Sequence, residues 1–176
     1  MLAQFDVNLV VYCDAALAET VWQHRQQHNT KVIIKEVEEF SKSFDFFKQV
    51  QNIRNNNTWK DQASWLRNSP QSTLEYFNPI IMSKFIMLHD TCIMNPFGSK
   101  QIYWIDGGIA STVNLGYFSN YNVQDRLPSL VNNLVFLCFP YDGQVEVHGF
   151  TKGKFNEYAG QNTEYVARGG FFGGSI

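Results

Sequence analysis

Residues 101–112 read QIYWIDGGIAST, and this stretch decides the fold. An apolar run rich in aromatic residues ends at Asp106, and Gly107 and Gly108 follow it. Such a run predicts a buried strand. An aspartate at the end of a strand, followed by glycines, is part of a metal or phosphate site in some proteins. In others it is part of a turn. The spacing by itself favours the turn.

Outward from this strand, apolar β-branched runs alternate with helical patterns. Strands are predicted at 7–15, 31–37 and 101–106, helices at 16–28, at 38–56 and from Pro79 through Leu88, and further strands or a short helix at 129–140, 143–150 and 164–172. Right-handed crossovers in this order give a mostly parallel sheet. We therefore expect the α/β class, with a mostly parallel (mixed) sheet flanked by helices and with ligands at the carboxyl ends of its strands.

The length of 176 residues is enough for one domain with a hydrophobic core, and we expect a single domain over residues 1–176. A strand already lies near residue 5, and the sequence stops at GGFFGGSI without a closing helix. We therefore expect the chain to be a fragment of a longer domain, truncated at both ends.

Composition and charge exclude several classes of protein. The net charge of −2 argues against sequence-independent nucleic-acid binding, which depends on clustered Lys and Arg. The longest apolar runs are far too short to span a membrane. Cys13, Cys92 and Cys138 lie in apolar runs, which predicts reduced, buried thiols. We expect a cytoplasmic protein without a transmembrane segment, and leave peripheral contact with a membrane open.

The candidate site residues carry two interpretations each. Asp106 could take one position on Mg²⁺ or Mn²⁺, or could simply satisfy nearby backbone N–H groups. In RGGFFGG (168–174), Arg168 could bind a phosphate above a flat glycine floor, or the segment could be a bend between two strands. Lys84 is the lone cation on an apolar helix face, and could reach a diphosphate or extend to solvent.

Three stretches together resemble the bacterial HtrL/YibB protein family: TWKDQASWLRNSPQSTLEYFNPIIMSKFIML (58–88), YWIDGGIASTV (103–113) and YVARGGFFGG (165–174). The likeness spans most of residues 8–174. That family looks like a set of GT-A-type glycosyltransferases, many of them associated with surface polysaccharide genes. The resemblance implies a GT-A/Rossmann-like fold. It also implies that WIDGG binds the metal and the donor diphosphate, and that the glycine-rich segment lines the pocket for the donor sugar and the acceptor.

One departure from the family pattern concerns the metal. The acidic motif of such enzymes commonly has a second carboxylate two residues after the first, and Gly108 stands there in this chain. Lys84 and Arg168 are therefore alternatives to a divalent cation for neutralising the diphosphate.

The residues and the resemblance together predict a glycosyltransferase of GT-A type that moves a sugar from a nucleotide-sugar donor to a polysaccharide or glycan acceptor. The residues predicted to bind the donor are Lys84, Asp106, Gly107, Gly108, Arg168, Gly169 and Gly170, with Mn²⁺ or Mg²⁺ at Asp106. Glu164 and Asp142 are the candidates for the base that deprotonates the acceptor, with Asp106 the third predicted catalytic residue. The alternative is a non-catalytic α/β module that binds a carbohydrate or a protein, as a degenerate relative of such an enzyme.

Overall fold

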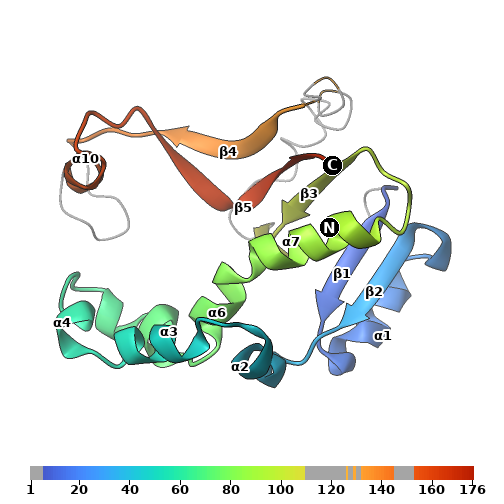
Figure 1. The fold of residues 1–176 in the computed structure, drawn as a ribbon, viewed down its shortest axis with the longest axis horizontal. Helices are drawn as coiled ribbons and strands as arrows, with labels where there is room; N and C mark the ends of the chain where they lie inside the picture. The colour runs from blue at the N-terminus through green and yellow to red at the C-terminus, as the bar shows by residue number, and fades with distance from the viewer. Residues whose placement is uncertain (1–5, 110–125, 127–128, 130–131, 145–152) are drawn as a thin grey trace. The chain divides into compact units, whose positions relative to one another are not determined.

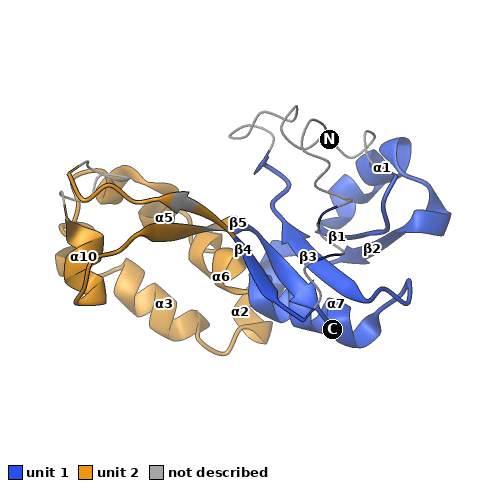
Figure 2. Ribbon diagram, turned by 90° about the horizontal axis from the view of Figure 1, so that it is seen from above, with its two compact units in different colours: residues 1–39, 84–136, 170–176 blue, residues 40–83, 137–169 orange. Residues whose placement is uncertain are grey.

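The structure, a computed structural model, describes residues 6–109, 126, 129, 132–144 and 153–176 (Figure 1). It contains two compact units, drawn in different colours in Figure 2. Unit 1 comprises Met1–Glu39, Lys84–Phe136 and Gly170–Ile176, and unit 2 comprises Phe40–Ser83 and Leu137–Gly169. The single domain over residues 1–176 stays a prediction.

Unit 1 begins with a strand–helix–strand crossover. Strand β1 (Leu9–Cys13) and strand β2 (Thr30–Ile34) pair in parallel, and helix α1 (Ala15–His24) and the 3-10 turn η1 (Gln27–Asn29) connect them. Of the two apolar residues at helical spacing in α1, Val21 is buried and Leu17 is exposed. A second 3-10 turn, η2 (Val37–Glu39), follows β2. The two predicted strands and the helix between them are confirmed.

A second sheet is antiparallel and contains three described strands. They are β3 (Gln101–Ile105), β4 (Leu134–Pro140) and β5 (Tyr165–Ser175), in the order β3-β5-β4. Between β3 and β5, Tyr103 lies opposite Gly173. The glycine-rich segment is therefore the central strand of this sheet, and the interpretation of it as a bend is wrong.

The predicted fold class is wrong, because the described strands do not form a mostly parallel, GT-A/Rossmann-like sheet flanked by helices. β1 and β2 form one small parallel sheet, and β3 pairs with β5 in a separate antiparallel sheet. The glycines of β5 show why these strands fit together. A Cβ atom at Gly173 would lie 2.2 Å from the carbonyl oxygen of Ile102, and one at Gly174 would lie 2.3 Å from that of Asn133. Bare backbone therefore lets its neighbours approach β5 more closely than a side chain would allow.

Unit 2 is built mainly from short helices. They are α2 (Phe40–Ser43), α3 (Phe47–Arg54), α4 (Asn57–Lys60), η3 (Leu66–Asn68), α5 (Pro70–Thr73), α6 (Phe77–Met82) and α10 (Lys154–Ala159). The single helix predicted at 38–56 is wrong, because the chain leaves the helix at residues 44–46 to bury Phe44. The core of unit 2 contains the buried side chains of Phe40 and Phe44, together with those of Ala63 and Leu66.

Helix α7 (Lys84–Met94) leads into β3 and packs against it. The helix predicted from Pro79 through Leu88 is two helices, because α6 ends at Met82, before Ser83, and α7 begins at Lys84. No helix in the described part of the chain has the length and apolar character needed to cross a membrane. The strand predicted at 143–150 lies largely outside the described residues.

The three cysteines have free thiols. Cys13 and Cys92 are half-buried, and burial raises the pKa of both thiols. Cys138 is exposed, so the predicted burial is wrong for this residue. It follows Leu134 and Phe136 at alternate positions of β4, and this face of the strand is exposed to solvent.

Candidate functional site

Asp106 directly follows β3, and two side chains hold its carboxylate. The Nζ atom of Lys84 lies 2.7 Å from both carboxylate oxygens. The indole Nε1 of Trp104 donates a hydrogen bond of 2.6 Å to Oδ1. Trp104 stands two residues before Asp106, so the two side chains lie on the same side of the chain. The carboxylate is thereby fixed in orientation while the Asp106 side chain remains 34% exposed.

Lys84 lies on the buried face of α7. With Met87 and Thr91 it forms a row at helical spacing, and all three are buried. A buried ammonium is costly without a counter-charge, and Asp106 supplies that charge. The interpretation in which Lys84 extends to solvent is therefore wrong. Its contact with a diphosphate stays a prediction.

A cluster of aromatic rings packs behind this ion pair. Phe172 of β5 is 1% exposed. The centroid of its ring lies 4.4 Å from that of Phe85, 6.0 Å from that of Phe136 and 6.4 Å from that of Trp104. Such packing restricts the rotamers of Trp104, so its N–H group is pre-oriented toward Asp106.

The predicted glycines lie near Asp106 to different degrees. Asp106 donates its backbone N–H to the carbonyl oxygen of Gly170 over 3.0 Å. A Cβ atom at Gly170 would lie 3.6 Å from Oδ2 of Asp106, an ordinary contact. At Gly107, Gly108 and Gly169 an added Cβ would meet no atom within 4 Å. Within the described residues, the space beside the backbone of Gly107 is therefore open to the approach of a ligand.

The surroundings of Asp106 do not fit a divalent cation. Mg²⁺ and Mn²⁺ require several oxygen ligands, and within the described ranges no three His, Cys, Asp or Glu side chains form such a group. The ammonium of Lys84 already takes the position between the two oxygens that a cation would use. A metal ion there would meet a buried like charge. The predicted Mn²⁺ or Mg²⁺ stays untested, and this geometry does not favour it.

The other three predicted residues, Glu164, Asp142 and Arg168, belong to unit 2. Glu164 is exposed, and its backbone oxygen accepts a hydrogen bond from the N–H of Tyr141. Asp142 is exposed, and its carboxylate accepts from the backbone N–H of Gln144 at 2.8 Å, as in an Asx turn. Arg168 is part of β5, and its side chain lies outside the described part of the structure. Their roles stay predictions.

Unit 2 contains other carboxylate–cation pairs, Lys154 with Glu157 and, in the tryptophan-rich segment, Arg67 with Asp61. Arg67 donates from Nε to Oδ1 of Asp61 at 2.9 Å, and both side chains are more than half exposed. Trp59 and Trp65 are half-buried in the same segment. Two tryptophans in one segment can bind a sugar or belong to the core, and their partial burial agrees with either role.

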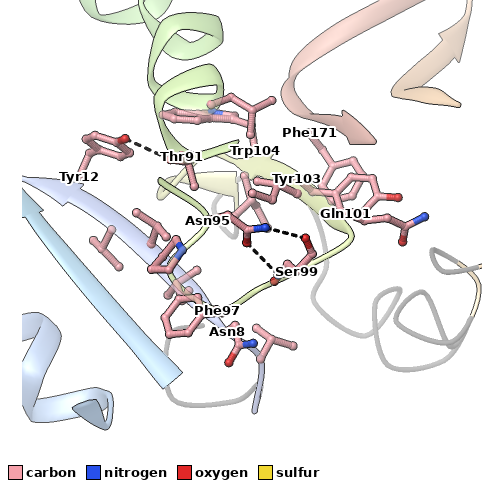
Figure 3. Close-up of a pocket in the computed structure, with 18 of the residues that line it drawn as sticks. Asn8, Tyr12, Thr91, Asn95, Phe97, Ser99, Gln101, Tyr103, Trp104 and Phe171 are labelled. Atoms are coloured by element: carbon pink, nitrogen blue, oxygen red, sulfur yellow. Dashed lines mark hydrogen bonds between the residues drawn. The ribbon is translucent and has the colours of Figure 1, made fainter. Parts of the chain in front are cut away.

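A cavity of about 420 Å³ lies in unit 1 beside Asp106 (Figure 3). Its wall consists of residues 7–12, which include most of β1, and of residues 101–105 of β3. Residues from the end of α7 and from the loop after it complete the wall. Gly107 and Trp104 belong to the same wall, so the cavity reaches the residue next to Asp106. Figure 3 shows the rings of Tyr103 and Phe171 side by side, with centroids 5.6 Å apart.

Sequence reasoning did not identify this cavity or the role of Trp104. The signal for Trp104 was present, because residues two apart in a strand share a face. No local pattern indicates the cavity, since β1 and β3 are some ninety positions apart in the sequence and meet only in the fold.

Comparisons with known proteins identify the family. No curated protein and no solved structure matches the chain. A family model described as "Bacterial protein of unknown function (HtrL_YibB)" matches residues 1–174, nearly the full sequence. The description of this family assigns no activity to its members. The chain therefore belongs to the HtrL_YibB family.

Proposed function

We propose that the chain binds a sugar at Asp106 and transfers it from a nucleotide-sugar donor to a glycan or polysaccharide acceptor. The observation that carries this proposal is the carboxylate of Asp106, fixed by Lys84 and Trp104 yet one-third exposed. A carboxylate held in this way has lone pairs in defined directions, as the recognition of sugar hydroxyl groups requires.

The charge of the site supports a neutral ligand group at Asp106. Lys84 and Asp106 together carry no net charge, so their exposed side attracts a hydroxyl donor more than an ion. Sugar hydroxyl groups are such donors. Gly107 lines the cavity, and a Cβ added there would meet no described atom within 4 Å, so a bulky sugar has room beside the carboxylate.

In the proposed transfer, positive charge must stabilise the leaving diphosphate. Lys84 shares its charge with Asp106, so Arg168, two residues before Gly170 in β5, is our choice for the diphosphate contact. Glu164 and Asp142 remain the proposed bases for the acceptor hydroxyl. Both have carboxylates that can accept a proton. The carboxylate of Asp142 already accepts a hydrogen bond from the backbone N–H of Gln144, so Glu164 is the preferred base.

A second candidate function is a non-catalytic module that binds a carbohydrate. The observation in its favour is the position of Lys84, which contacts both oxygens of Asp106 and so competes with any metal-assisted chemistry there. Both candidates use the same sugar contact. They differ in whether the nucleotide is bound and the sugar released.

Calorimetry with UDP-glucose and a panel of other nucleotide sugars, with and without Mn²⁺, tests the main proposal. We expect binding that Asp106→Asn weakens by about tenfold or more, since the amide replaces one oxygen acceptor with a donor. Asp61→Asn, which alters the exposed pair of unit 2, is the matched control and should leave binding unchanged.

The possible outcomes separate the two candidates. Binding of a nucleotide sugar with release of the nucleoside diphosphate on addition of acceptor supports the transferase. Binding of oligosaccharides alone supports the non-catalytic module. A folded chain that binds neither class refutes both, and binding that strictly requires Mn²⁺ would restore the predicted cation.

A further inference from the structure

The cavity in unit 1 lies along one edge of strand β1 and one edge of strand β3. Its wall includes the consecutive residues 9–12 of β1 and 101–105 of β3. Successive side chains of a strand point to opposite faces, so a cavity on one face would be lined by every second residue only. Consecutive lining residues mean that the cavity runs beside the main chain of each strand.

On β1, the main-chain groups that face the cavity are those of Val10 and Tyr12. The carbonyl oxygen of Cys13 accepts a hydrogen bond from Lys35, directly after β2, at 3.0 Å. Alternation then directs the groups of Val11 to β2 and those of Val10 and Tyr12 to the opposite edge. Within the described residues, no strand pairs with this edge of β1.

On β3, the groups that face the cavity are those of Gln101, Tyr103 and Ile105. The N–H of Asp106 donates to Gly170, and the N–H of Ile176 donates to Lys100. Residues with even numbers therefore point toward β5, and those with odd numbers point away from it. This second edge also has no strand partner in the ranges that the structure describes.

The side chains of the wall indicate the chemistry of an occupant. The residues that line the cavity include no Asp, Glu, Lys or Arg, and many are aliphatic or aromatic. Two polar atoms of wall residues, Nε2 of Gln101 and the hydroxyl of Tyr103, are buried without a hydrogen-bond partner among the described residues. These two atoms have no accessible surface, so they do not face an occupant, and it is the uncharged, largely apolar lining that favours an uncharged one.

We propose that the cavity is a slot for an extended, uncharged peptide segment of a partner protein, which adds as a strand between β1 and β3. Main-chain groups of alternate peptide residues would bond to β1, and those of the remaining residues to β3. Its apolar side chains would pack on the cavity wall. The slot borders the sugar site, because Trp104 and Gly107 belong to its wall, but the peptide would bind through the main chain of β1 and β3 and not through Asp106.

An extended peptide fits these observations better than a compact molecule. Main-chain groups without a strand partner among the described residues recur at alternate positions of the five-residue strand β3, over a length of about 17 Å. A polypeptide presents donors and acceptors at this repeat on both of its edges. A small apolar ligand would fill part of the volume and leave most of these groups unpaired.

Hydrogen exchange of the full chain, followed by NMR at single residues, tests whether the edges are open. We expect the amides of Val10, Tyr12 and Tyr103 to exchange on the order of 100-fold faster than those of Val11 and Trp104, which belong to the ladders. Equal protection of the two sets would mean that both edges are already paired, and would overturn the proposal.

Selection from a displayed library of random eight-residue peptides provides the binding test. We expect enriched peptides of low charge that slow exchange at Val10, Tyr12 and Tyr103. Methylating every second peptide nitrogen removes the donors to one edge, and should weaken binding by about tenfold for either of the two alternating sets. No enrichment, or tolerance of methylation in either set, would overturn the two-edged slot.

Protein variants give an independent check. Val10→Pro removes an N–H that faces the slot and leaves the ladder with β2 complete, as proline permits at an open edge. It should weaken peptide binding by about tenfold, while Val10→Ala, which keeps the N–H, should weaken it by less than about threefold. If Val10→Pro does not fold, the methylated peptides decide. Dimers that protect the same amides would assign the slot to a second copy and overturn the partner-peptide proposal.

Discussion

Among the described residues, two aspartates form an ion pair with a lysine or an arginine, Asp106 with Lys84 in unit 1 and Asp61 with Arg67 in unit 2. The shortest nitrogen–oxygen distances are similar, 2.7 Å and 2.5 Å. Their surroundings differ, because the side chains of Lys84 and Asp106 are 9% and 34% exposed, and those of Arg67 and Asp61 are 51% and 57% exposed. The comparison teaches that burial, more than distance, decides what an ion pair contributes.

Removing the buried cation should have the largest effect. Lys84→Met leaves Asp106 as a partly buried charge without its counter-charge, and should lower the free energy of unfolding by about 2–4 kcal/mol. Urea unfolding followed by tryptophan fluorescence measures this. The double variant Lys84→Met with Asp106→Asn should recover about half of the loss, since the uncompensated charge is then gone. A loss below about 0.5 kcal/mol in the single variant would place the two ion pairs in the same class.

Removing the neutral donor of the buried site should have an intermediate effect. Trp104→Phe keeps an aromatic ring beside Phe172 and deletes the N–H that donates to Asp106. The free energy of unfolding should fall by about 1–2 kcal/mol. Trp22→Phe, at a residue 39% exposed in α1, is the control for the general effect of this substitution. Equal losses in the two variants would show that the hydrogen bond contributes nothing to stability.

Removing the exposed cation should change little. Arg67→Met should shift the free energy of unfolding by no more than about 0.5 kcal/mol, because water and salt already screen this pair. The same urea titration measures it. A loss of about 2 kcal/mol would show that the pair of unit 2 is as important as the buried one, and would break the comparison.

Salt should produce the smallest effect and the finest distinction. At 1 M NaCl the screening length is about 3 Å, so the difference in stability between wild type and Arg67→Met should vanish. The difference between wild type and Lys84→Met should persist to within about 0.5 kcal/mol, since a buried pair is screened much less. Unfolding titrations of the three proteins at low and high salt provide the measurement. Loss of both differences would indicate that the Lys84 site is open to ions.

The sequence predicted where the strands of unit 1 lie along the chain better than it predicted which strands pair with each other. Apolar runs located β1, β2 and β3, because a buried strand leaves a local pattern. They did not indicate that β3 pairs with β5, since the close approach of these strands depends on Gly173, which lies seventy positions after its partner Tyr103. The assumed parallel sheet followed from element order alone, and element order does not specify which edges meet.

The candidate site was predicted residue by residue and not as an arrangement. Asp106 and Lys84 were both chosen from the sequence, the first for its place at a strand end and the second as a lone cation on an apolar face. That they neutralise each other could not be predicted, because the 22 positions between them include the rest of α7 and the loop before β3. For the same reason, a metal ligand and a diphosphate contact were expected where the structure has an ion pair.

The glycines of β5 also limit where this protein can be engineered. A label, a crosslinker or a randomised codon at Gly173 or Gly174 would push against main chain of a neighbouring strand, which cannot move aside as a flexible side chain can. Four positions earlier in the same strand, Gly169 has no atom within 4 Å of where a side chain would begin. Spectroscopic probes for β5 therefore belong at its first half, and libraries that vary this strand should keep its second pair of glycines fixed.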